Sequence, residues 1–243
     1  MWGVATSAPV RRYRARVPRA VVFDFYGTLS VSATVAARRA GAARIAAALG
    51  IPAETWHEAI ATTFTQRATG ACGDLERTMR WLADRCAVSP SPAQLAEACT
   101  IRIETETVYA RQLRADAEPT LRELHDLGVK IGLLSDCTHE LPEIWPSLPV
   151  APYVDATVFS VLAGARKPHP TLYEAVTSEL NVHPAECLYV GDGGSGELTG
   201  AKRAGMAALR LDAPDAADAI IYDADAAWTG TAVASLSEVL HFV

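Results

Sequence analysis

Asp24 is the first residue of the chain whose setting suggests chemistry, because it directly follows the apolar run AVVF. Gly27, which permits a tight turn, and Thr28, whose hydroxyl can brace that turn, follow within four residues. A carboxylate in this setting suits a nucleophile, although a polar strand end before an ordinary turn would look the same. Ser135 ends the run IGLLS, where its hydroxyl could donate a hydrogen bond to an anionic substrate oxygen.

Lys167 and the acidic pair Asp192 and Glu197 are the remaining candidates. Lys167 precedes two prolines in KPHP, which make its loop rigid, so its ammonium group could neutralise a nucleophilic carboxylate and the group under attack. Asp192 and Glu197 belong to the glycine-rich stretch GDGGSGEL, which enters a helical pattern. Carboxylates presented into one crevice suit a hard cation such as Mg²⁺, whereas a plain helix cap would not require four glycines.

Short apolar segments that alternate with helical patterns must position these side chains. The predicted strands are Val21–Phe25, Lys130–Ser135, Thr157–Ser160, Cys187–Val190 and Ala207–Leu211, and the clearest helical patterns between them are Pro119–Leu127 and Pro170–Leu180. This alternation predicts an α/β fold, a doubly wound parallel sheet with helices on both faces. In such folds the active site lies beyond the carboxyl ends of the strands, which is where the candidate residues stand.

Residues 31–115 interrupt the alternation, because they contain helical patterns and no good strand pattern. We expect an all-helical domain at 31–115, inserted after the first strand of a core that comprises 18–30 and 116–243. Residues 1–17, which include the basic cluster RRYRAR, are expected to form a flexible tail.

Composition narrows the classes of partner. A net charge of −6 argues against nucleic acid, and no apolar run reaches the length of a membrane span. The first residues lack the charged and apolar parts of a signal peptide. The five cysteines are widely spaced and odd in number, which favours reduced thiols. We therefore expect a cytoplasmic protein that binds a small anionic substrate, and neither nucleic acid nor a membrane.

Taken in order, the four stretches resemble the four motifs of the haloacid dehalogenase superfamily, with FDFYGTL first, Ser135 second, Lys167 third and GDGGSGEL fourth. The resemblance implies a Rossmann-like core, a helical insertion placed like the C1 cap of that family, and an aspartate nucleophile that forms a covalent intermediate. It implies catalytic roles for Asp24, Tyr26, Thr28, Ser135 and Lys167, substrate binding by Ser135, Asp136 and Lys167, and Mg²⁺ binding by Asp24, Tyr26, Asp192 and Glu197. A cap arginine near the glycine-rich bend TGACGD, which is Arg67, Arg77 or Arg80, could bind the substrate anion, and of these we name Arg67.

Tyr26 departs from most phosphatases of that superfamily, which carry a second aspartate two residues after the nucleophile. A tyrosine, with an ordinary pKa near 10, is a poor base at neutral pH. The 2-haloacid dehalogenases carry tyrosine here, but they use no metal and lack the equivalent of Asp192. Three interpretations remain: a Mg²⁺-dependent phosphohydrolase, which we favour, a metal-free dehalogenase, and a catalytically impaired ligand-binding protein.

Overall fold

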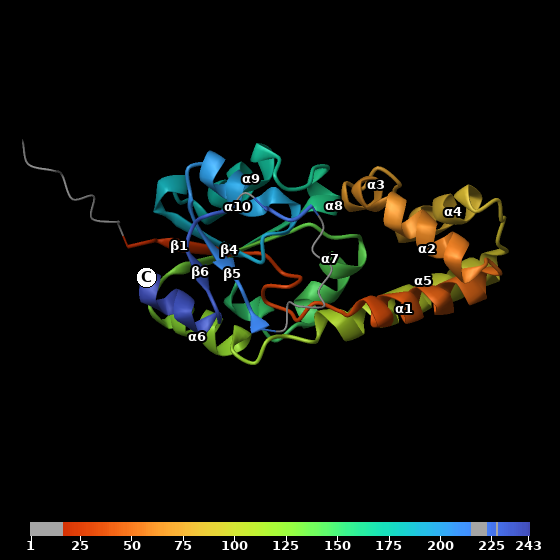
Figure 1. Cartoon of the computed structure of the whole chain (residues 1–243), viewed down its shortest axis with the longest axis horizontal. Coiled ribbons are helices and arrows are strands. Elements are labelled where there is room, and N and C mark those ends of the chain that lie inside the picture. The colour runs from red at the N-terminus through yellow and green to blue at the C-terminus, as the bar shows by residue number, and fades with distance from the viewer. Residues whose placement is uncertain (1–16, 215–222, 227) are drawn as a thin grey trace, which may run out of the picture.

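The structure is a computed structural model that describes residues 17–214, 223–226 and 228–243. The tail predicted at 1–17, apart from Val17, lies outside the described residues. The described residues form a six-stranded parallel sheet with the strand order β3-β2-β1-β4-β5-β6 (Figure 1). The strands are β1 (Ala20–Phe23), β2 (Lys130–Ser135), β3 (Ala156–Phe159), β4 (Cys187–Gly191), β5 (Ala207–Leu211) and β6 (Ala232–Val233).

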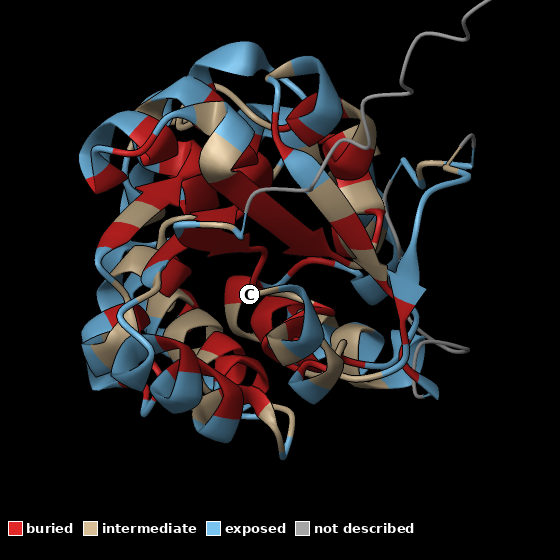
Figure 2. Ribbon diagram, turned by 90° about the vertical axis from the view of Figure 1, so that its left-hand side faces the viewer, coloured by how far each residue is buried: buried red, intermediate tan, exposed pale blue. Residues whose placement is uncertain are grey.

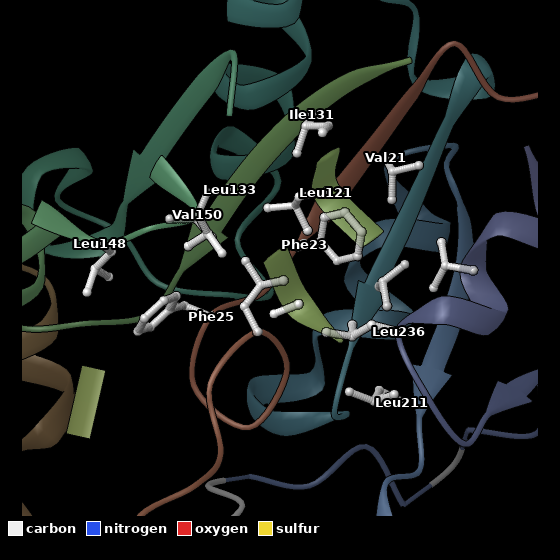
Figure 3. Packing of buried hydrophobic residues seen from close by; sticks show 14 of the residues in the cluster. Val21, Phe23, Phe25, Leu121, Ile131, Leu133, Leu148, Val150, Leu211 and Leu236 are labelled. Carbon is white, nitrogen blue, oxygen red and sulfur yellow. The ribbon is translucent and has the colours of Figure 1, made fainter. Parts of the chain in front are cut away.

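Strand β1 is apolar at every position because it is covered on both faces. Val21 and Phe23 pack into one hydrophobic cluster, and Ala20 and Val22, which point to the opposite face, pack into a second. All four residues are fully buried. Figure 3 shows Val21 and Phe23 within the first cluster. The buried strands lie between helices whose outer faces are exposed (Figure 2).

Helices cover both faces of this sheet, which confirms the predicted doubly wound, Rossmann-like α/β fold. The cluster around Phe23 includes residues of α6 (Ala117–Asp126), α7 (Glu140–Ile144) and the 3₁₀ helix η6 (Ser237–Phe242). The cluster around Val22 includes residues of α9 (Pro170–Leu180) and α10 (Glu197–Arg203). Within the described part of the chain, no helix is both long and apolar enough to cross a membrane.

Five helices form a lobe beside the sheet (Figure 1). They are α1 (Val35–Leu49), α2 (Ala53–Thr62), α3 (Phe64–Ala68), α4 (Leu75–Arg85) and α5 (Pro92–Ala110). The lobe has its own hydrophobic cluster around the fully buried Trp56. Ser91 and Gln94 form a capping box before α5, whose first residue is a proline, so the longest helix of the lobe starts at a well-defined point. These helices fall within 31–115, and the division of the chain into two domains stays a prediction.

Several details of the predicted sheet were wrong, and the strand expected at Thr157–Ser160 is Ala156–Phe159. The strand expected at Val21–Phe25 ends at Phe23, because the chain turns there and the Phe25 ring leaves the sheet to pack edge-to-face on Trp145, 5.8 Å between ring centres. Strand β6 was not expected, because two residues are too short to leave an alternating pattern.

Candidate active site

The carboxyl ends of three neighbouring strands bring the predicted site residues together. Strand β1 lies between β2 and β4, so Asp24, which follows β1, stands beside Ser135 at the end of β2 and Asp192 after β4. Lys167 comes from the loop between α8 (Ser160–Ala163) and α9, and its Nζ lies 2.6 Å from Asp24 Oδ1. Four segments that are distant in the sequence therefore meet at one edge of the sheet.

Asp24 is held by a hydrogen bond at each carboxylate oxygen. Lys167 donates to Oδ1, and the Thr28 hydroxyl donates to Oδ2 over 3.2 Å. Arg114 fixes the turn that runs from Asp24 to Thr28, because its guanidinium donates to the carbonyls of Gly27 (2.8 Å) and Thr28 (2.9 Å). Burial raises the pKa of Asp24 to about 7, against the lowering effect of Lys167. The side chain is thus oriented, and its burial makes its ionisation harder than that of an exposed aspartate.

Among the described residues, Lys167 is the only cationic side chain with a hydrogen bond to Asp24 or Glu197. Its Nζ donates to Asp24, to Glu197 Oε2 over 2.5 Å and to the Tyr189 hydroxyl over 3.3 Å. Burial by itself would lower the pKa of Lys167, but Asp24 and Glu197 raise it well above its ordinary value. Its backbone N–H donates to Asp136 Oδ1 over 2.9 Å, which anchors the loop. Lys167 therefore remains charged and fixed in place.

Glu197 is occupied by groups of the protein itself. Its Oε2 accepts hydrogen bonds from Lys167 and from the Tyr189 hydroxyl (2.7 Å), and its Oε1 accepts one from the Gly193 N–H (2.9 Å). A Cβ on Gly191 would lie only 2.0 Å from Oε1, so the carboxylate needs a glycine beside it. The side chain is fully buried, and this burial raises the pKa of Glu197. The geometry therefore places Glu197 behind Lys167, with little capacity left for the metal that the sequence led us to expect there.

Asp192 is better placed to face a cation. Its Oδ1 accepts a hydrogen bond from the Gly194 N–H over 2.8 Å, and its Oδ2 lies 2.3 Å from where a Cβ on Gly27 would be. Gly27 also has a φ of +83°, so two independent constraints require glycine at the turn after Asp24. Burial, followed by repulsion from Asp24, raises the pKa of Asp192 to about 6.

The acidic cluster fits a magnesium ion. Carboxylate oxygens of Asp24, Asp192 and Glu197 all lie within 4.8 Å of one another, and the single charge of Lys167 does not balance these three acids, of which Asp24 and Glu197 are buried and Asp192 is half-buried. The donors are all oxygen, and Mg²⁺ takes one or two carboxylates and keeps several waters. Glu197 accepts three hydrogen bonds from protein groups, Asp24 accepts two from side chains and Asp192 accepts one from a backbone N–H, so Asp24 and Asp192 keep more capacity to hold the ion.

Tyr26 lies at the boundary between the sheet edge and the helical lobe. Its hydroxyl donates to Glu106 Oε2 of α5 over 3.4 Å, and Glu106 Oε1 lies 3.0 Å from Arg102 Nη1. Burial, with the nearby Glu106 charge, raises the pKa of the Tyr26 phenol well above 10. The phenol is therefore protonated at neutral pH. Because it is bound to Glu106, any metal ligand at position 26 would have to be the backbone carbonyl.

The other predicted substrate-binding residues differ in their settings. Ser135 is fully buried and its hydroxyl has no hydrogen-bond partner among the described residues, which leaves one donor unused next to Asp24. Asp136 uses one oxygen for the Lys167 N–H and the other for Arg166 Nε (3.2 Å). Arg67 lines the cavity described below, where its Nη2 donates to the Ile60 carbonyl over 2.8 Å.

Arg166 was not expected from the sequence, yet it joins four segments. Its guanidinium donates to Asp136, to Ser195 Oγ (2.8 Å), to Thr65 Oγ1 of α3 (3.1 Å) and to Asp223 (3.2 Å). It therefore links the helical lobe to the loops after β2 and β4. No sequence signal distinguishes it from a surface arginine beside Lys167.

Arg102 and Glu106 were also missed, although their spacing gave a signal. They lie four residues apart on α5, the spacing of an intrahelical ion pair. Arg102 also donates to Glu140 Oε1 of α7 over 2.6 Å, which ties the lobe to the core a second time.

A cavity of about 170 Å³ lies between the sheet edge and the helical lobe. The core lines it with Asp24, Tyr26, Asp136, Lys167, Asp192, Ser195 and Glu197, and the lobe lines it with residues that include Arg38, His57, Phe64, Arg67, Arg102, Glu106 and Tyr109. This volume suits a small molecule. Several carboxylates, the Lys167 ammonium group and several arginines therefore face one cavity.

Comparison with known proteins agrees with this fold. A family model described as haloacid dehalogenase-like hydrolase matches residues 18–205. The glyceraldehyde 3-phosphate phosphatase of Methanopyrus kandleri is 28% identical over 79% of this chain and 83% of its own. The phosphoglycolate phosphatase of Yersinia pseudotuberculosis is 31% identical over 79% of this chain and 80% of its own. A 2-haloacid dehalogenase structure from Pseudomonas syringae shares the fold, with a TM-score of 0.65, 20% identity and coverage of 92% and 96%.

Proposed function

The chain belongs to the haloacid dehalogenase-like hydrolase family, and on that basis we propose that it is a Mg²⁺-dependent phosphohydrolase that acts on a small phosphorylated molecule. Relatives named for phosphatase activity, which span most of this chain, support the reaction class. The observation that carries the proposal is the pairing of Asp24 with Asp192 beside Lys167 at the floor of the cavity. A metal-free dehalogenase has no need for the second acid.

Asp24 is the proposed nucleophile. One of its carboxylate oxygens attacks phosphorus, the bond from phosphorus to the leaving oxygen breaks, and an aspartyl phosphate forms. Lys167 and Thr28 hold the carboxylate in place through their hydrogen bonds. The unused Ser135 hydroxyl is the proposed donor to a phosphoryl oxygen.

Asp24 and Asp192, with the Tyr26 backbone carbonyl, are the proposed holders of Mg²⁺. When bound, the ion supplies positive charge beside the transferred phosphoryl group. Glu197 keeps Lys167 charged and oriented toward Asp24. The helical lobe acts as the cap that encloses the substrate, since it forms one wall of the cavity.

Proton transfer needs a substitute for the aspartate that most phosphatases of this family carry at the position of Tyr26. The Tyr26 phenol is protonated and lines the cavity, so it can donate to the leaving oxygen, but its high pKa excludes it as the base that activates water. Glu106 accepts the phenol hydrogen bond and also lines the cavity. We assign the water proton to Glu106, because its carboxylate lines the cavity beside the Tyr26 phenol, whereas Asp136 anchors the Lys167 loop and Arg166.

The test is hydrolysis of p-nitrophenyl phosphate and of small alkyl phosphates, with Mg²⁺ and with EDTA. Release of phosphate that requires Mg²⁺ supports the function. p-Nitrophenolate leaves without a proton, so this substrate reports the nucleophile and the metal even where acid catalysis is weak. Failure to hydrolyse it with Mg²⁺ would contradict the proposal.

A 2-haloacid dehalogenase is the second candidate, and the phenol at position 26 is the observation that favours it. Halide leaves without a proton, so such a reaction needs no acid at this position. It predicts halide release from a 2-haloacid that is unaffected by EDTA. A comparison of halide and phosphate release by one preparation separates the two candidates.

A further inference from the structure

Arg38 is the feature of the cavity that the proposed reaction leaves unused. It lies on α1 and lines the helical side of the cavity. Its half-buried side chain has a buried Nε with no hydrogen-bond partner among the described residues. A buried donor that lacks a partner is costly. The cavity therefore presents a cationic group without an anion from the protein.

Its neighbours on the helix are paired. Arg39 lies 3.5 Å from Glu54 and Arg44 lies 3.4 Å from Glu104, both on the surface. Arg102, across the cavity, is matched by two carboxylates, those of Glu106 and Glu140. In the described part of the chain, no carboxylate lies within ion-pair distance of Arg38.

The Arg38 side chain is also held in place for binding. Its guanidinium carbon lies 5.9 Å from the centre of the Tyr109 ring. The Tyr109 hydroxyl donates to the Ala37 carbonyl over 2.7 Å, which fixes the ring against α1. A guanidinium that packs on a fixed ring loses less freedom when it binds a planar anion, and arginine binds carboxylates through two parallel hydrogen bonds.

We propose that Arg38 binds a carboxylate on the leaving group of the substrate, which makes the preferred substrate a short phosphorylated hydroxy acid. This inference rests on the proposed phosphohydrolase function, because the phosphoryl group is taken to occupy the floor beside Asp24. The cavity volume of about 170 Å³ favours a carboxylate close to the phosphate over a second phosphate on a longer chain. The inference predicts that the protein prefers phosphate esters with a carboxylate over sugar phosphates of similar size that lack one.

A matched pair of substrates tests it. 2-Phosphoglycolate and 2-hydroxyethyl phosphate differ only in a carboxylate against a hydroxymethyl group. The expected kcat/KM of the full-length protein is at least about 10-fold higher for 2-phosphoglycolate, and Arg38→Met should lower this ratio about 10- to 100-fold. Arg38→Lys should retain part of the preference. Arg39→Met, which alters the adjacent surface pair, is the control and should leave the ratio unchanged.

Two outcomes would overturn the inference: a wild-type ratio near one while both phosphates are hydrolysed, or an unchanged ratio in Arg38→Met. The first of these leaves the phosphohydrolase function intact. If no phosphate ester is hydrolysed, including p-nitrophenyl phosphate, the phosphohydrolase function fails. The role of Arg38 in carboxylate binding is then tested by calorimetry of the two esters. Binding of 2-phosphoglycolate at least 10-fold tighter than 2-hydroxyethyl phosphate, abolished by Arg38→Met, would support it, and equal binding would overturn it. Thermal unfolding of each variant shows whether it is folded.

Discussion

Lys167 Nζ and Asp24 Oδ1 lie 2.6 Å apart although the residues are 143 positions apart in the chain. The contact is buried, and the same ammonium group reaches Glu197. One cation thus holds the proposed nucleophile on one side and an acid of the fourth motif on the other. The site depends on this single charge.

Replacement of Lys167 by methionine should abolish more than 99% of the proposed phosphohydrolase activity and destabilise the protein. Asp24 and Glu197 would lose their shared partner, and removal of one member of a buried ion pair costs about 3–5 kcal/mol. Urea unfolding at pH 8 measures the loss, which should shrink at pH 5, where the raised pKa values of both acids allow protonation. A variant as stable and as active as the wild type would contradict this role.

Asp192→Asn and Glu197→Gln should separate a metal ligand from a residue that positions Lys167. Asp192→Asn is expected to weaken Mg²⁺ binding at least 10-fold, because it removes one of the two proposed carboxylate ligands. Glu197→Gln is expected to lower kcat while it changes Mg²⁺ affinity less than about threefold, because its oxygens are bound to protein groups. Calorimetry with Mg²⁺ measures both affinities. The reverse ranking would make Glu197 the ligand.

Stability of the metal-free protein should fall as the pH rises from about 4 to 7. The pKa of Asp24 is raised from 3.8 to about 7, and that of Asp192 to about 6, so ionisation of either acid is harder in the folded state. A raised acid pKa gives stability that is complete below the unfolded pKa and is lost as the pH passes the folded one. Melting temperatures of the wild type and of Asp24→Asn are measured from pH 4 to 8 in EDTA. As the pH rises from 4 to 7, the melting temperature of the wild type should fall relative to that of the variant.

Mg²⁺ should reverse this trend, because the two carboxylates must be deprotonated to bind it. We expect the wild type to bind Mg²⁺ at least 10-fold more tightly at pH 8 than at pH 5.5. An affinity that does not change with pH would mean that Asp24 and Asp192 do not hold the ion.

Tyr26→Asp is expected to raise kcat on alkyl phosphates at least 10-fold, since it supplies a carboxylate that can give and take a proton near neutral pH. A folded Tyr26→Asp variant whose kcat on alkyl phosphates does not rise would show that Tyr26 does not limit the reaction.

Glu106→Gln should lower kcat on p-nitrophenyl phosphate, because the proposed base for the water step is lost. Glu104→Gln, a surface change two residues away, is the control.

The floor of the site was predictable because it follows from strand ends. Once the alternation of strands and helices predicts a parallel sheet, Asp24, Ser135 and Asp192 must emerge at the same edge. The rigid loop of Lys167 faces that edge as well. The two prolines after Lys167 and the glycines around Asp192 indicated loops at this edge, which is why these residues were expected to lie together. Their chemical roles remain proposals.

The partners of these residues were not predictable in the same way. Glu197 looked like a metal ligand, and only the positions of Tyr189 and the Gly193 N–H show that its oxygens are occupied. Arg38 and Glu106 reach the cavity because the helical lobe packs over the sheet edge. That packing depends on contacts between distant segments, which helical periodicity does not encode.

The covalent intermediate on Asp24 is the central claim, and chemical trapping during turnover tests it most directly. Borohydride reduces an acyl phosphate to an alcohol, so quenching the wild type with a good substrate and Mg²⁺ should convert Asp24 to homoserine, which peptide mass spectrometry detects. The account predicts this conversion at Asp24 alone, and neither conversion nor turnover in Asp24→Asn. Turnover by Asp24→Asn, or conversion at a different residue, would contradict it.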